Sequence, residues 1–312
     1  MLKILLTGKN GQVGWELERS LQPLGQVFAF DRAGMDLANP DAIPRVIREV
    51  KPDLIVNAAA YTAVDKAESE PELAMAINGV APGIIAEEAK RLGAALIHYS
   101  TDYVFDGTKA EPYTEDDVPK PINVYGKTKL AGEQAVQAIG VPHLIFRTSW
   151  VYGMRGNNFL LTILRLAAER DELRVVNDQS GAPTWSRMIA EATAQIIGQT
   201  QGCSWEHGVS AAGNYGMYHL SAAGATTWFE FARQILELVA TQRSSDLSLR
   251  PLRSICLTPI PTCDYPLPAS RPTFSLLANA KLEREFGLTL PDWRAQLELV
   301  FHDNCVREGL RK

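Results

Sequence analysis

Short runs of consecutive apolar residues recur through the first half of the chain and alternate with stretches of helical character, such as residues 82–92 and 129–138. The runs are apolar throughout, so we expect strands buried on both faces, as in a parallel sheet covered by helices. The predicted strands are Ile4–Leu6, Val27–Phe30, Leu54–Asn57, Ala95–Tyr99 and Leu144–Phe146. A further run, Leu173–Val176, could add another parallel strand.

The pattern changes near Ser180, where Pro, Gly and Ser become frequent and helices become less regular. Amphipathic helices are still indicated at Phe229–Val239 and Trp293–Phe301. We therefore predict a doubly wound, Rossmann-like α/β domain over residues 1–180 and a smaller α+β domain over 181–312. A later helix or strand could return to the first domain.

Composition narrows the class of protein. The chain has 312 residues, is 46% apolar and carries a net charge of -5, so it lacks the basic surface expected of a nucleic-acid-binding protein. Apolar stretches fall short of the ~20 residues that a membrane span needs. The four cysteines lie outside any CxxC motif, so we expect reduced thiols, no zinc site and a cytoplasmic location. They are Cys203, Cys256, Cys263 and Cys305.

Three glycines, Gly8, Gly11 and Gly14, lie where the strand-like segment 3–7 meets the helix-like segment 11–21. Glycines at such a turn let the backbone approach a pyrophosphate held at the helix N-terminus. The GxxGxxG spacing is only moderately specific, and the alternative is an ordinary glycine turn. Residues 8–14 are thus a candidate dinucleotide site.

Asp31 ends the second strand-like run, 17 residues after Gly14, near the position of an acidic residue that binds the adenine ribose. Arg32 follows it directly. The carboxylate favours NADH and the guanidinium favours NADPH, so we expect use of both cofactors. The alternative for Asp31 is a solvated residue at a strand end.

Tyr125 and Lys129 stand four residues apart, and Asn123 is a plausible N-cap that would place them one turn apart on one helix face. A phenol is protonated at neutral pH and can act as a general acid, and a nearby ammonium is expected to lower its pKa. A surface Tyr and Lys at helical spacing is the plain alternative. The sequence Ser100-Thr101-Asp102 follows a predicted strand and brings a hydroxyl to the same crevice. Together these features indicate a nicotinamide-dependent oxidoreductase.

At this point the chain resembles the extended short-chain dehydrogenase/reductases, and within them the dTDP-4-dehydrorhamnose reductases, almost from end to end. Long strings carry the resemblance: residues 8–17, 56–60, 62–68, 99–105, 123–129, 147–152, 177–184 and 291–293. The resemblance implies reduction of the C4 ketone of a dTDP-linked 4-keto-6-deoxy sugar, dTDP-4-dehydro-L-rhamnose, by hydride from NADPH or NADH. It assigns the catalytic roles to Thr101, Tyr125 and Lys129, with Tyr125 as general acid.

The resemblance also implies binding roles. For the cofactor it assigns Gly11, Gln12, Val13, Asp31, Asp36, Leu37, Ala58, Ala59, Ala60 and Lys129, and the residue pattern itself adds Gly8, Gly14, Arg32 and Tyr125. The substrate would meet Thr101, Asp102 and Trp150, and Arg271 could grip its diphosphate unless it is a solvated loop residue. The segment 178–184 could contact the nucleotide-sugar or be an ordinary turn.

Other features have plainer interpretations. We expect His98 to be a hydrogen-bonded structural histidine, and Glu68, Glu70 and Glu72 to be a solvated helix start. Members of the resembled family have been associated with Mg²⁺ at a subunit interface, but no ligands for it can be assigned, and a homodimer is possible. The stretch 202–217 is longer than the family pattern.

Two other functions remain open. One is another nucleotide-sugar enzyme on this fold, such as an epimerase, reductase or dehydratase, although Asp102-Tyr103 after Thr101 does not fit the Asp-Glu pair of dehydratases. The other is a non-catalytic regulatory subunit resembling the β-subunit of methionine adenosyltransferase, which would not need the three catalytic residues.

Overall fold

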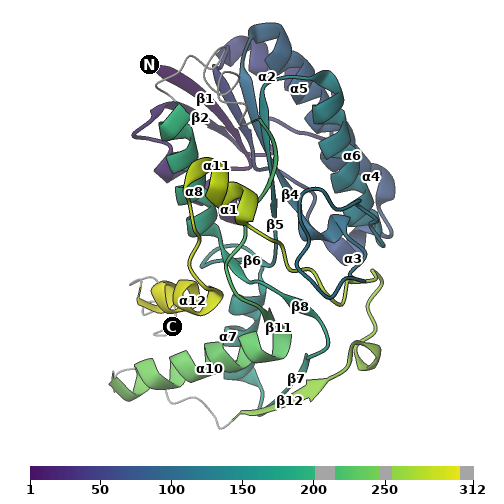
Figure 1. Cartoon of the computed structure of the whole chain (residues 1–312), viewed down its shortest axis with the longest axis vertical. Coiled ribbons are helices and arrows are strands. Elements are labelled where there is room, and N and C mark those ends of the chain that lie inside the picture. Colours follow the sequence, from purple (N-terminus) through teal and green to yellow (C-terminus); the bar gives the residue numbers. More distant parts are fainter. Residues whose placement is uncertain (201–214, 246–254, 303–312) are drawn as a thin grey trace.

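The computed structural model describes residues 1–200, 215–245 and 255–302. Within them, the central sheet has six parallel strands in the order β2-β1-β3-β4-β5-β10 (Figure 1). These strands are β1 (Leu2–Thr7), β2 (Gly25–Phe30), β3 (Leu54–Asn57), β4 (Ala95–Thr101), β5 (His143–Thr148) and β10 (Gly216–His219). Each strand predicted in the first half of the chain is present.

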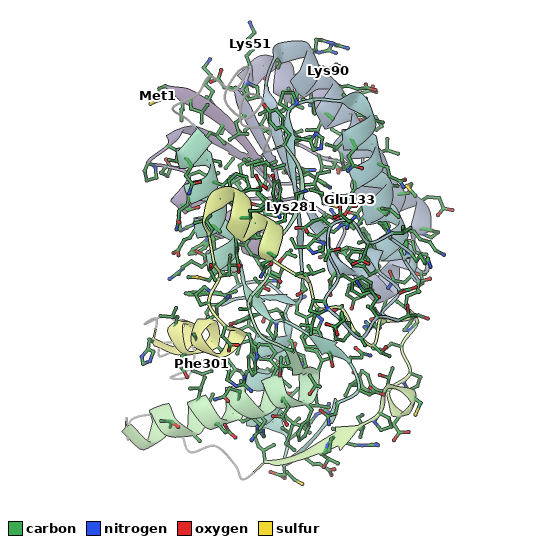
Figure 2. All side chains as sticks on the ribbon, in the orientation of Figure 1. Met1, Lys51, Lys90, Glu133, Lys281 and Phe301 are labelled. Atoms are coloured by element: carbon green, nitrogen blue, oxygen red, sulfur yellow. The ribbon has the colours of Figure 1, made fainter. Side chains whose placement is uncertain are left out.

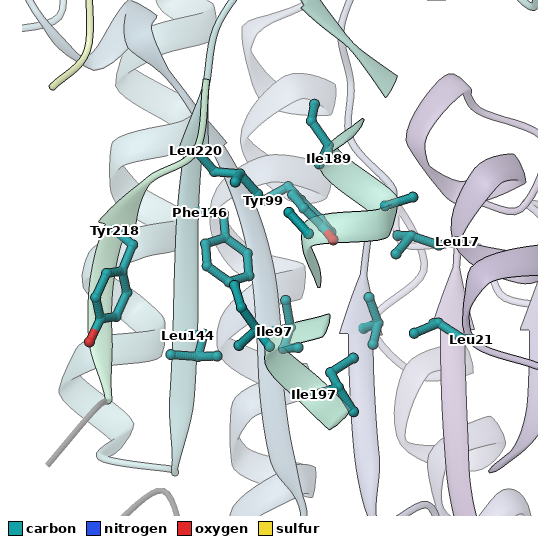
Figure 3. Packing of buried hydrophobic residues seen from close by; sticks show 14 of the residues in the cluster. Leu17, Leu21, Ile97, Tyr99, Leu144, Phe146, Ile189, Ile197, Tyr218 and Leu220 are labelled. Atoms are coloured by element: carbon teal, nitrogen blue, oxygen red, sulfur yellow. The ribbon is translucent and has the colours of Figure 1, made fainter. Parts of the chain in front are cut away.

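Helices cover both faces of this sheet (Figure 1). One face carries α2 (Ala42–Val50), α5 (Ala81–Leu92) and α6 (Val124–Ile139), and the other carries α1 (Gln12–Ser20), α8 (Ser186–Thr200) and α11 (Ala280–Phe286). Alternate strand residues enter the two cores: Ile4 and Leu6 pack on the α1 and α8 side, and Leu5 packs on the α2 and α5 side. Figure 3 shows the first core, where Leu17 and Ile189 lie against the sheet. The predicted doubly wound fold is confirmed.

A nearly continuous helical run precedes α5. It consists of α3 (Val64–Ala67), α4 (Pro71–Met75) and the π-helical turn η1 (Ala76–Val80). The side chain of Asn78, in that turn, accepts a hydrogen bond from Tyr61 N and donates one to Tyr61 O. Helix α6 packs so closely here that a Cβ at Gly132 would lie 2.1 Å from the Asn78 carbonyl oxygen. These contacts fix α6 against the loop that follows β3.

The second half of the chain adds a part with its own core at the carboxyl ends of the central strands (Figure 1). Its helices are α7 (Phe159–Glu169), α10 (Trp228–Ser245) and α12 (Trp293–His302). Two-residue strands pair β6 (Val151–Tyr152) with β9 (Thr184–Trp185), and β8 (Ser180–Gly181) with β11 (Thr226–Thr227). The helices predicted at 229–239 and 293–301 are α10 and α12.

The predicted strand at 173–176 is present as β7 (Glu172–Val176), and it is parallel, but it does not join the central sheet. Its partner is β12 (Cys256–Ile260), in a separate two-stranded sheet. The sixth strand of the central sheet is instead β10, which pairs with β5.

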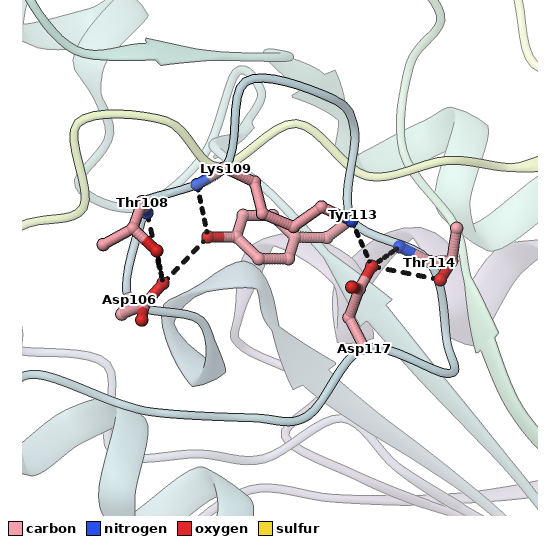
Figure 4. Close-up of polar contacts among 6 residues, drawn as sticks. All are labelled: Asp106, Thr108, Lys109, Tyr113, Thr114 and Asp117. Carbon is pink, nitrogen blue, oxygen red and sulfur yellow. Dashed lines mark hydrogen bonds and ion pairs between the residues drawn. The ribbon is translucent and has the colours of Figure 1, made fainter.

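The loop between the short helix η2 (Asp102–Val104) and α6 is closed by its own polar side chains (Figure 4). Asp106 accepts a hydrogen bond from the Tyr113 hydroxyl at 3.0 Å, and Asp117 accepts one from Lys109 at 2.7 Å. Tyr113 also pairs through its main chain with residues 276–278, beyond the short helix η3 (Thr262–Asp264). The loop is thereby joined to the C-terminal part of the chain.

Figure 2 shows how the side chains are distributed along the molecule. Met1, Lys51 and Lys90 lie near one end, Phe301 lies near the other, and Glu133 lies between them. Cys256 and Cys263 are exposed free thiols, as expected, whereas Cys203 and Cys305 lie outside the described residues. Among the described helices, none combines the length and the apolar character that crossing a membrane requires.

Candidate active site

The glycine turn between β1 and α1 is tightly closed. Gly8 has φ +75°, and a Cβ there would lie 2.8 Å from Ala59 N. A Cβ at Gly14 would lie 2.1 Å from the Gly8 carbonyl oxygen. Helix α1 begins after Gly11 without a side-chain cap, so its first N–H groups are available to a ligand. The turn thus has the tight packing and the available N–H groups that binding a phosphate group requires.

A cavity of about 610 Å³ opens beside this turn, at the carboxyl ends of the central strands. Every residue assigned to the cofactor from the sequence lines it, except Gly14, which packs beneath the turn against Gly8. The same cavity is also lined by Ser100 and by residues that the sequence did not single out: Met35, Tyr61, Thr62, Ala63, Ile77, Tyr99, Thr148, Val151, Gly156 and Asn157.

One end of the cavity carries charges of both signs. The Asp31 carboxylate accepts hydrogen bonds from Gly34 N at 3.1 Å and from Asn10 Nδ2 at 3.2 Å, and Lys9 Nζ lies 4.0 Å away. The bond from Gly34 is the main reason that the pKa of Asp31 is lowered. The Arg32 side chain is 74% exposed, with its Nε 3.5 Å from the Asp36 carboxylate. The ionised Asp31 and the cations at this rim suit a ribose with or without a phosphate.

The predicted Tyr/Lys pair lies on the first turns of α6. Asn123 caps this helix, as expected, by accepting a hydrogen bond from Gly126 N at 2.7 Å. Lys129 is 2% exposed, and its Nζ donates a 2.6 Å hydrogen bond to Tyr99 O and lies 3.4 Å from His98 Nε2. Burial lowers the pKa of Lys129 to about 8, and the charge of Glu133 partly opposes this effect. The ammonium is therefore held at the cavity by a strand, β4.

Tyr125 is surrounded by polar groups but not by a stabilising cation. Burial raises its pKa to about 12, although a hydrogen bond with the Thr101 side chain favours the phenolate. The expectation that Lys129 lowers this pKa is therefore wrong for this structure. The reason is geometric, because Nζ turns toward β4 while the phenol turns toward Thr101. The phenol stays protonated at neutral pH and can donate its proton.

Asp102 lies behind this pair and is also buried. Its Oδ1 accepts a hydrogen bond from Thr101 Oγ1 at 3.1 Å, and its Oδ2 has no partner among the described residues. Burial raises its pKa to about 7, and the nearby Ser275 side chain opposes the rise. The Asp102 charge in turn raises the pKa of Tyr125. Thr101, Asp102 and Tyr125 are thus brought together as predicted, although the roles assigned to them remain proposals.

Two buried hydroxyls in the cavity lack partners in the described structure. They are Ser100 Oγ and Thr148 Oγ1, and both residues line the cavity with Tyr125 and Lys129. Buried polar atoms are normally satisfied, so these orphan atoms mark positions where a bound molecule would supply the partner. Thr148 was not predicted from the sequence, although a hydroxyl at the end of β5 is the same signal that pointed to Thr101 at the end of β4.

A second cavity, of about 740 Å³, lies within the C-terminal part. Its lining includes the aromatic ring of Trp228, the Gln179 amide and the guanidinium groups of Arg174 and Arg271. Trp228 Nε1 donates to Gln179 Oε1 at 3.2 Å. The lining also holds the carboxylates of Glu172 and Asp264, and Arg174 lies 3.8 Å from Asp264, so Arg271 is the arginine better placed to meet a phosphate. Trp228 was not predicted from the sequence.

Trp150 lines neither cavity, but it shapes the second one. Its ring stacks on Trp228 with centroids 3.5 Å apart, and a Cβ at Gly181 would lie 2.4 Å from it. Trp150 has φ +45°, a conformation that costs a bulky residue free energy and that the surrounding packing must hold in place. In this structure Trp150 therefore supports the ring of Trp228, which lines the second cavity.

Arg271 is held by an acidic partner. Its two terminal nitrogens donate to Asp65 Oδ1 at 3.0 Å and Oδ2 at 2.7 Å, a bidentate pair. Arg271 also interacts with the Tyr103 hydroxyl, and the Tyr103 ring packs edge-on against Tyr125 with centroids 5.6 Å apart. Tyr103 thus connects the lining of the second cavity to the tyrosine of the first.

The remaining predicted segments are held by hydrogen bonds, and Gln179 of the segment 178–184 also lines the second cavity. Asp178 accepts hydrogen bonds from the main chain and hydroxyl of Thr262, so the turn at 178–184 is tied to the strand-end beyond β12. Glu68 accepts a hydrogen bond from Val124 N at 2.8 Å, at the start of α6. Glu70 accepts one from the Tyr61 hydroxyl at 2.7 Å, and Glu72 is exposed in the first turn of α4. Within the part of the chain that the structure describes, His, Cys, Asp and Glu side chains form no group of three that could hold a metal ion.

The fold and the site together define a protein of the short-chain dehydrogenase/reductase class: a doubly wound parallel sheet, a glycine turn after β1, and a Tyr/Lys pair on a helix beside the same cavity. Comparison with known proteins gives the family. The family described as RmlD substrate binding domain matches residues 2–305, so the chain belongs to it.

The similarity to relatives of known name extends along almost the whole length of both chains. A dTDP-4-dehydrorhamnose reductase of Burkholderia thailandensis is 49% identical over 309 residues, which cover 99% of each chain. The Escherichia coli K12 protein of the same name is 47% identical over 306 residues, covering 97% of this chain and 98% of the relative. The crystal structure of dTDP-4-dehydrorhamnose reductase from Bacillus anthracis in complex with NADP superposes with a TM-score of 0.85 at 35% identity, covering 97% of this chain and 99% of that one. The protein is therefore an oxidoreductase of this family.

Proposed function

We propose that the protein reduces the C4 ketone of dTDP-4-dehydro-L-rhamnose to the alcohol of dTDP-L-rhamnose. The observation that carries the proposal is the arrangement of Tyr125, bonded to Thr101 and beside Lys129, in the cavity that begins at the glycine turn. The names of the relatives support the substrate.

The cavity fits a nicotinamide dinucleotide. The glycine turn offers backbone N–H groups to a pyrophosphate, and Asp31 offers an acceptor to a ribose hydroxyl. The orphan hydroxyls of Ser100 and Thr148 supply hydrogen-bonding capacity near Lys129, where the nicotinamide end would lie. When bound, the reduced cofactor would supply a hydride to the carbonyl carbon, and it would leave oxidised.

Tyr125 supplies the proton. Its pKa of about 12 keeps the phenol protonated at neutral pH, so it can donate to the C4 oxygen as negative charge develops there. The electron pair of the C=O π bond moves to oxygen, the new C–H bond forms at carbon, and the phenol proton completes the alcohol. After the transfer the Thr101 hydroxyl can turn its proton from Asp102 Oδ1 to the tyrosine oxygen, and this bond would stabilise the phenolate that remains.

Lys129 holds the nicotinamide end of the site. Nζ donates a hydrogen bond to Tyr99 O and contacts His98 Nε2, and a remaining N–H can donate to a ribose hydroxyl in the cavity. In this structure Nζ turns toward β4, so its part in the reaction would be to hold the cofactor beside Tyr125. Removal of Lys129 is therefore expected to weaken cofactor binding and to slow the reaction.

The nucleotide of the substrate would occupy the second cavity. Trp228 and Phe159 offer aromatic surface to the base, and Arg271 and Arg174 offer positive charge to the diphosphate. Arg271 would retain Asp65 as an orienting partner, because the bonds to Asp65 and to Ala269 O do not use the Nε hydrogen of the guanidinium group.

The test follows nicotinamide absorbance in the presence of dTDP-4-dehydro-L-rhamnose, with NADPH and NADH supplied separately. Wild-type protein is expected to oxidise the cofactor only when the ketone is present, and Tyr125→Phe is expected to lose about 10²–10⁴ of the rate while it still binds cofactor. A folded wild-type protein that binds NADPH but leaves the ketone unreduced would overturn the proposal and favour a regulatory subunit.

A further inference from the structure

A row of buried polar side chains crosses the central sheet beneath the cavity. Thr7, Asn57 and His98 stand in register at neighbouring positions of β1, β3 and β4, and each is 1% exposed. Thr7 Oγ1 donates to Asn57 Oδ1 at 2.7 Å, and Asn57 Nδ2 lies 3.1 Å from His98 Nδ1. Three adjacent strands therefore share one hydrogen-bonded line in their interior.

Both ends of this row reach the wall of the cavity. At one end Ala59 N donates to Thr7 Oγ1 at 3.2 Å, and at the other His98 Nε2 lies 3.4 Å from Lys129 Nζ. Ala59 and Lys129 each line the cavity. His98 is a hydrogen-bonded core histidine, as expected from the sequence, but its second nitrogen contacts a residue of the candidate site.

The direction of each bond fixes where the protons lie. With Thr7 donating to Asn57 Oδ1, the Asn57 amide nitrogen must donate to His98 Nδ1. A neutral imidazole then carries its proton on Nε2, which faces Lys129. This order suits an uncharged lysine amine, since a protonated ring nitrogen cannot accept a bond from an ammonium.

Rotation of the Asn57 amide by a half-turn exchanges the places of its oxygen and nitrogen and reverses the row, and the other heavy atoms can stay in place. Asn57 Oδ1 then accepts from His98 Nδ1–H, and Asn57 Nδ2 donates to Thr7 Oγ1, which has lone pairs for both this bond and the one from Ala59 N. His98 Nε2 becomes an acceptor for the Lys129 ammonium. Because a charge-assisted hydrogen bond is about twice as strong as a neutral one, the row favours the charged form of Lys129.

We propose that His98 is a positioning residue for Lys129, and that the Thr7–Asn57–His98 row switches between two hydrogen-bond orders according to the charge on Lys129. In the ammonium order His98 and Tyr99 O together fix Nζ from β4, and the remaining N–H of the ammonium points to the cavity. The role rests on the function proposed above, which requires the ammonium form.

The other ionisable groups near Lys129 do not fix its charge, so a hydrogen bond with His98 can influence it. On the same helix, Glu133 is the acidic residue whose charge acts on Lys129. Glu133 also forms a buried bidentate pair with Arg147 of β5, at 2.9 and 2.7 Å, so the positive charge of Arg147 largely balances its negative charge. Tyr125 is a neutral phenol, and His143 of β5 acts on His98 by lowering its pKa. The pKa of Lys129, at about 8, is near enough to neutrality for one hydrogen bond to change its charge during catalysis.

Two substitutions at the same position separate a positioning role from simple packing. An Asn side chain can replace His98 Nδ1 and keep the contact with Asn57, but it does not reach Lys129. A Gln side chain extends as far as Nε2 and can present an oxygen to Nζ. His98→Asn is expected to move the alkaline limb of the kcat profile down by about one pH unit, the size of one charge-assisted bond, whereas His98→Gln is expected to keep it close to wild type.

Thermal unfolding would first show that both variants are folded. An alkaline limb that stays in place in folded His98→Asn, or that moves equally in both variants, would overturn the proposal. Absence of any activity in wild type would count against the reductase function and leave the row to be tested by a second measurement.

That measurement needs no substrate. In protein with ¹⁵N-labelled imidazole rings, the His98 signals, identified by their loss in His98→Gln, report which nitrogen carries the proton. Nδ1 is expected to gain the proton and Nε2 to lose it as pH falls through the titration of Lys129, and Lys129→Met is expected to abolish the change. A single unchanged tautomer in wild type from about pH 6 to pH 10, the range around the lysine titration, would contradict the switch.

Discussion

The Nζ atom of Lys129 donates a 2.6 Å hydrogen bond to the main-chain carbonyl oxygen of Tyr99. This bond joins α6 to β4 at the floor of the cavity, and it turns the charged end of Lys129 away from the phenol of Tyr125. The two residues of the YxxxK pattern are therefore neighbours on one helix with separate partners: Tyr125 bonds to Thr101, and Lys129 bonds to the strand. Their cooperation in catalysis would arise through the molecules bound between them.

The first prediction concerns Asp102, whose pKa is raised to about 7 by burial. Between about pH 4 and pH 7 the folded protein binds more protons at Asp102 than the unfolded chain, so this group makes stability fall as pH rises. Asp102→Asn removes the buried charge. We expect the variant to exceed wild type in free energy of unfolding by about 2–4 kcal/mol above pH 7, and the gain to vanish near pH 4.

Denaturant unfolding at pH 4, 6 and 8 would measure this difference, and the reductase assay would be expected to show a loss of rate in the same variant. A gain in stability that is equal at all three pH values would mean that burial does not raise the pKa of Asp102.

The second prediction concerns the glycine turn. A Cβ at Gly14 would lie 2.1 Å from the Gly8 carbonyl oxygen, whereas one at Gly11 would lie 3.2 Å from the same atom. Gly14→Ala must therefore open the turn, and we expect a loss of about 1–3 kcal/mol in stability together with a large loss of NADPH affinity. Gly11→Ala needs only a small shift and is the matched control for stability, whereas it acts on NADPH directly, because Gly11 lines the cavity.

Thermal unfolding and NADPH fluorescence titration would be compared in the two variants. Equal losses of stability in both would show that the tight contact between Gly14 and Gly8 is not what holds the turn.

The third prediction concerns the choice of cofactor. Asp31→Asn keeps an oxygen that can accept from Gly34 N but removes the negative charge beside the ribose. The Michaelis constant for NADPH is expected to fall and that for NADH to rise, because an amide no longer repels the 2′-phosphate and is a weaker acceptor for the 2′-hydroxyl. Arg32→Met is expected to produce the opposite change.

Michaelis constants for both cofactors would be measured in the two variants at low and moderate salt. If Asp31→Asn affects NADH and NADPH alike, the carboxylate does not discriminate between them, and Lys9, 4.0 Å away, would be the next residue to test.

The sequence predicted the central fold well because its signals are local. Each strand of the first half is a compact apolar run, and glycines, caps and turn residues mark the helices. Strand partners are not local. The run at 173–176 looked like another strand of a parallel sheet, but the central sheet takes its sixth strand from residues 216–219, beyond a segment rich in glycine and serine.

The candidate site was likewise predicted only in part: residues within motifs were found, and residues outside them were missed. Residues in recognisable strings, such as Gly8 and Tyr125, line one cavity, but Thr148 and Trp228 stand in no motif and were missed. The pKa of Tyr125 depends on which way Lys129 turns, and helical spacing alone does not fix that direction. His98 appeared ordinary in the sequence because its contact with Lys129 joins two elements that lie 31 residues apart.

The central claim is transfer of a hydride from the cofactor to C4 of the sugar, with a proton from Tyr125. The most direct test supplies NADPH with deuterium at both positions of the reactive nicotinamide carbon, together with dTDP-4-dehydro-L-rhamnose, and locates the label in the product by NMR and mass spectrometry. The account predicts one deuterium at C4 of the sugar for each cofactor oxidised. A product that carries no deuterium, or a sugar that changes configuration without net oxidation of NADPH, would contradict it.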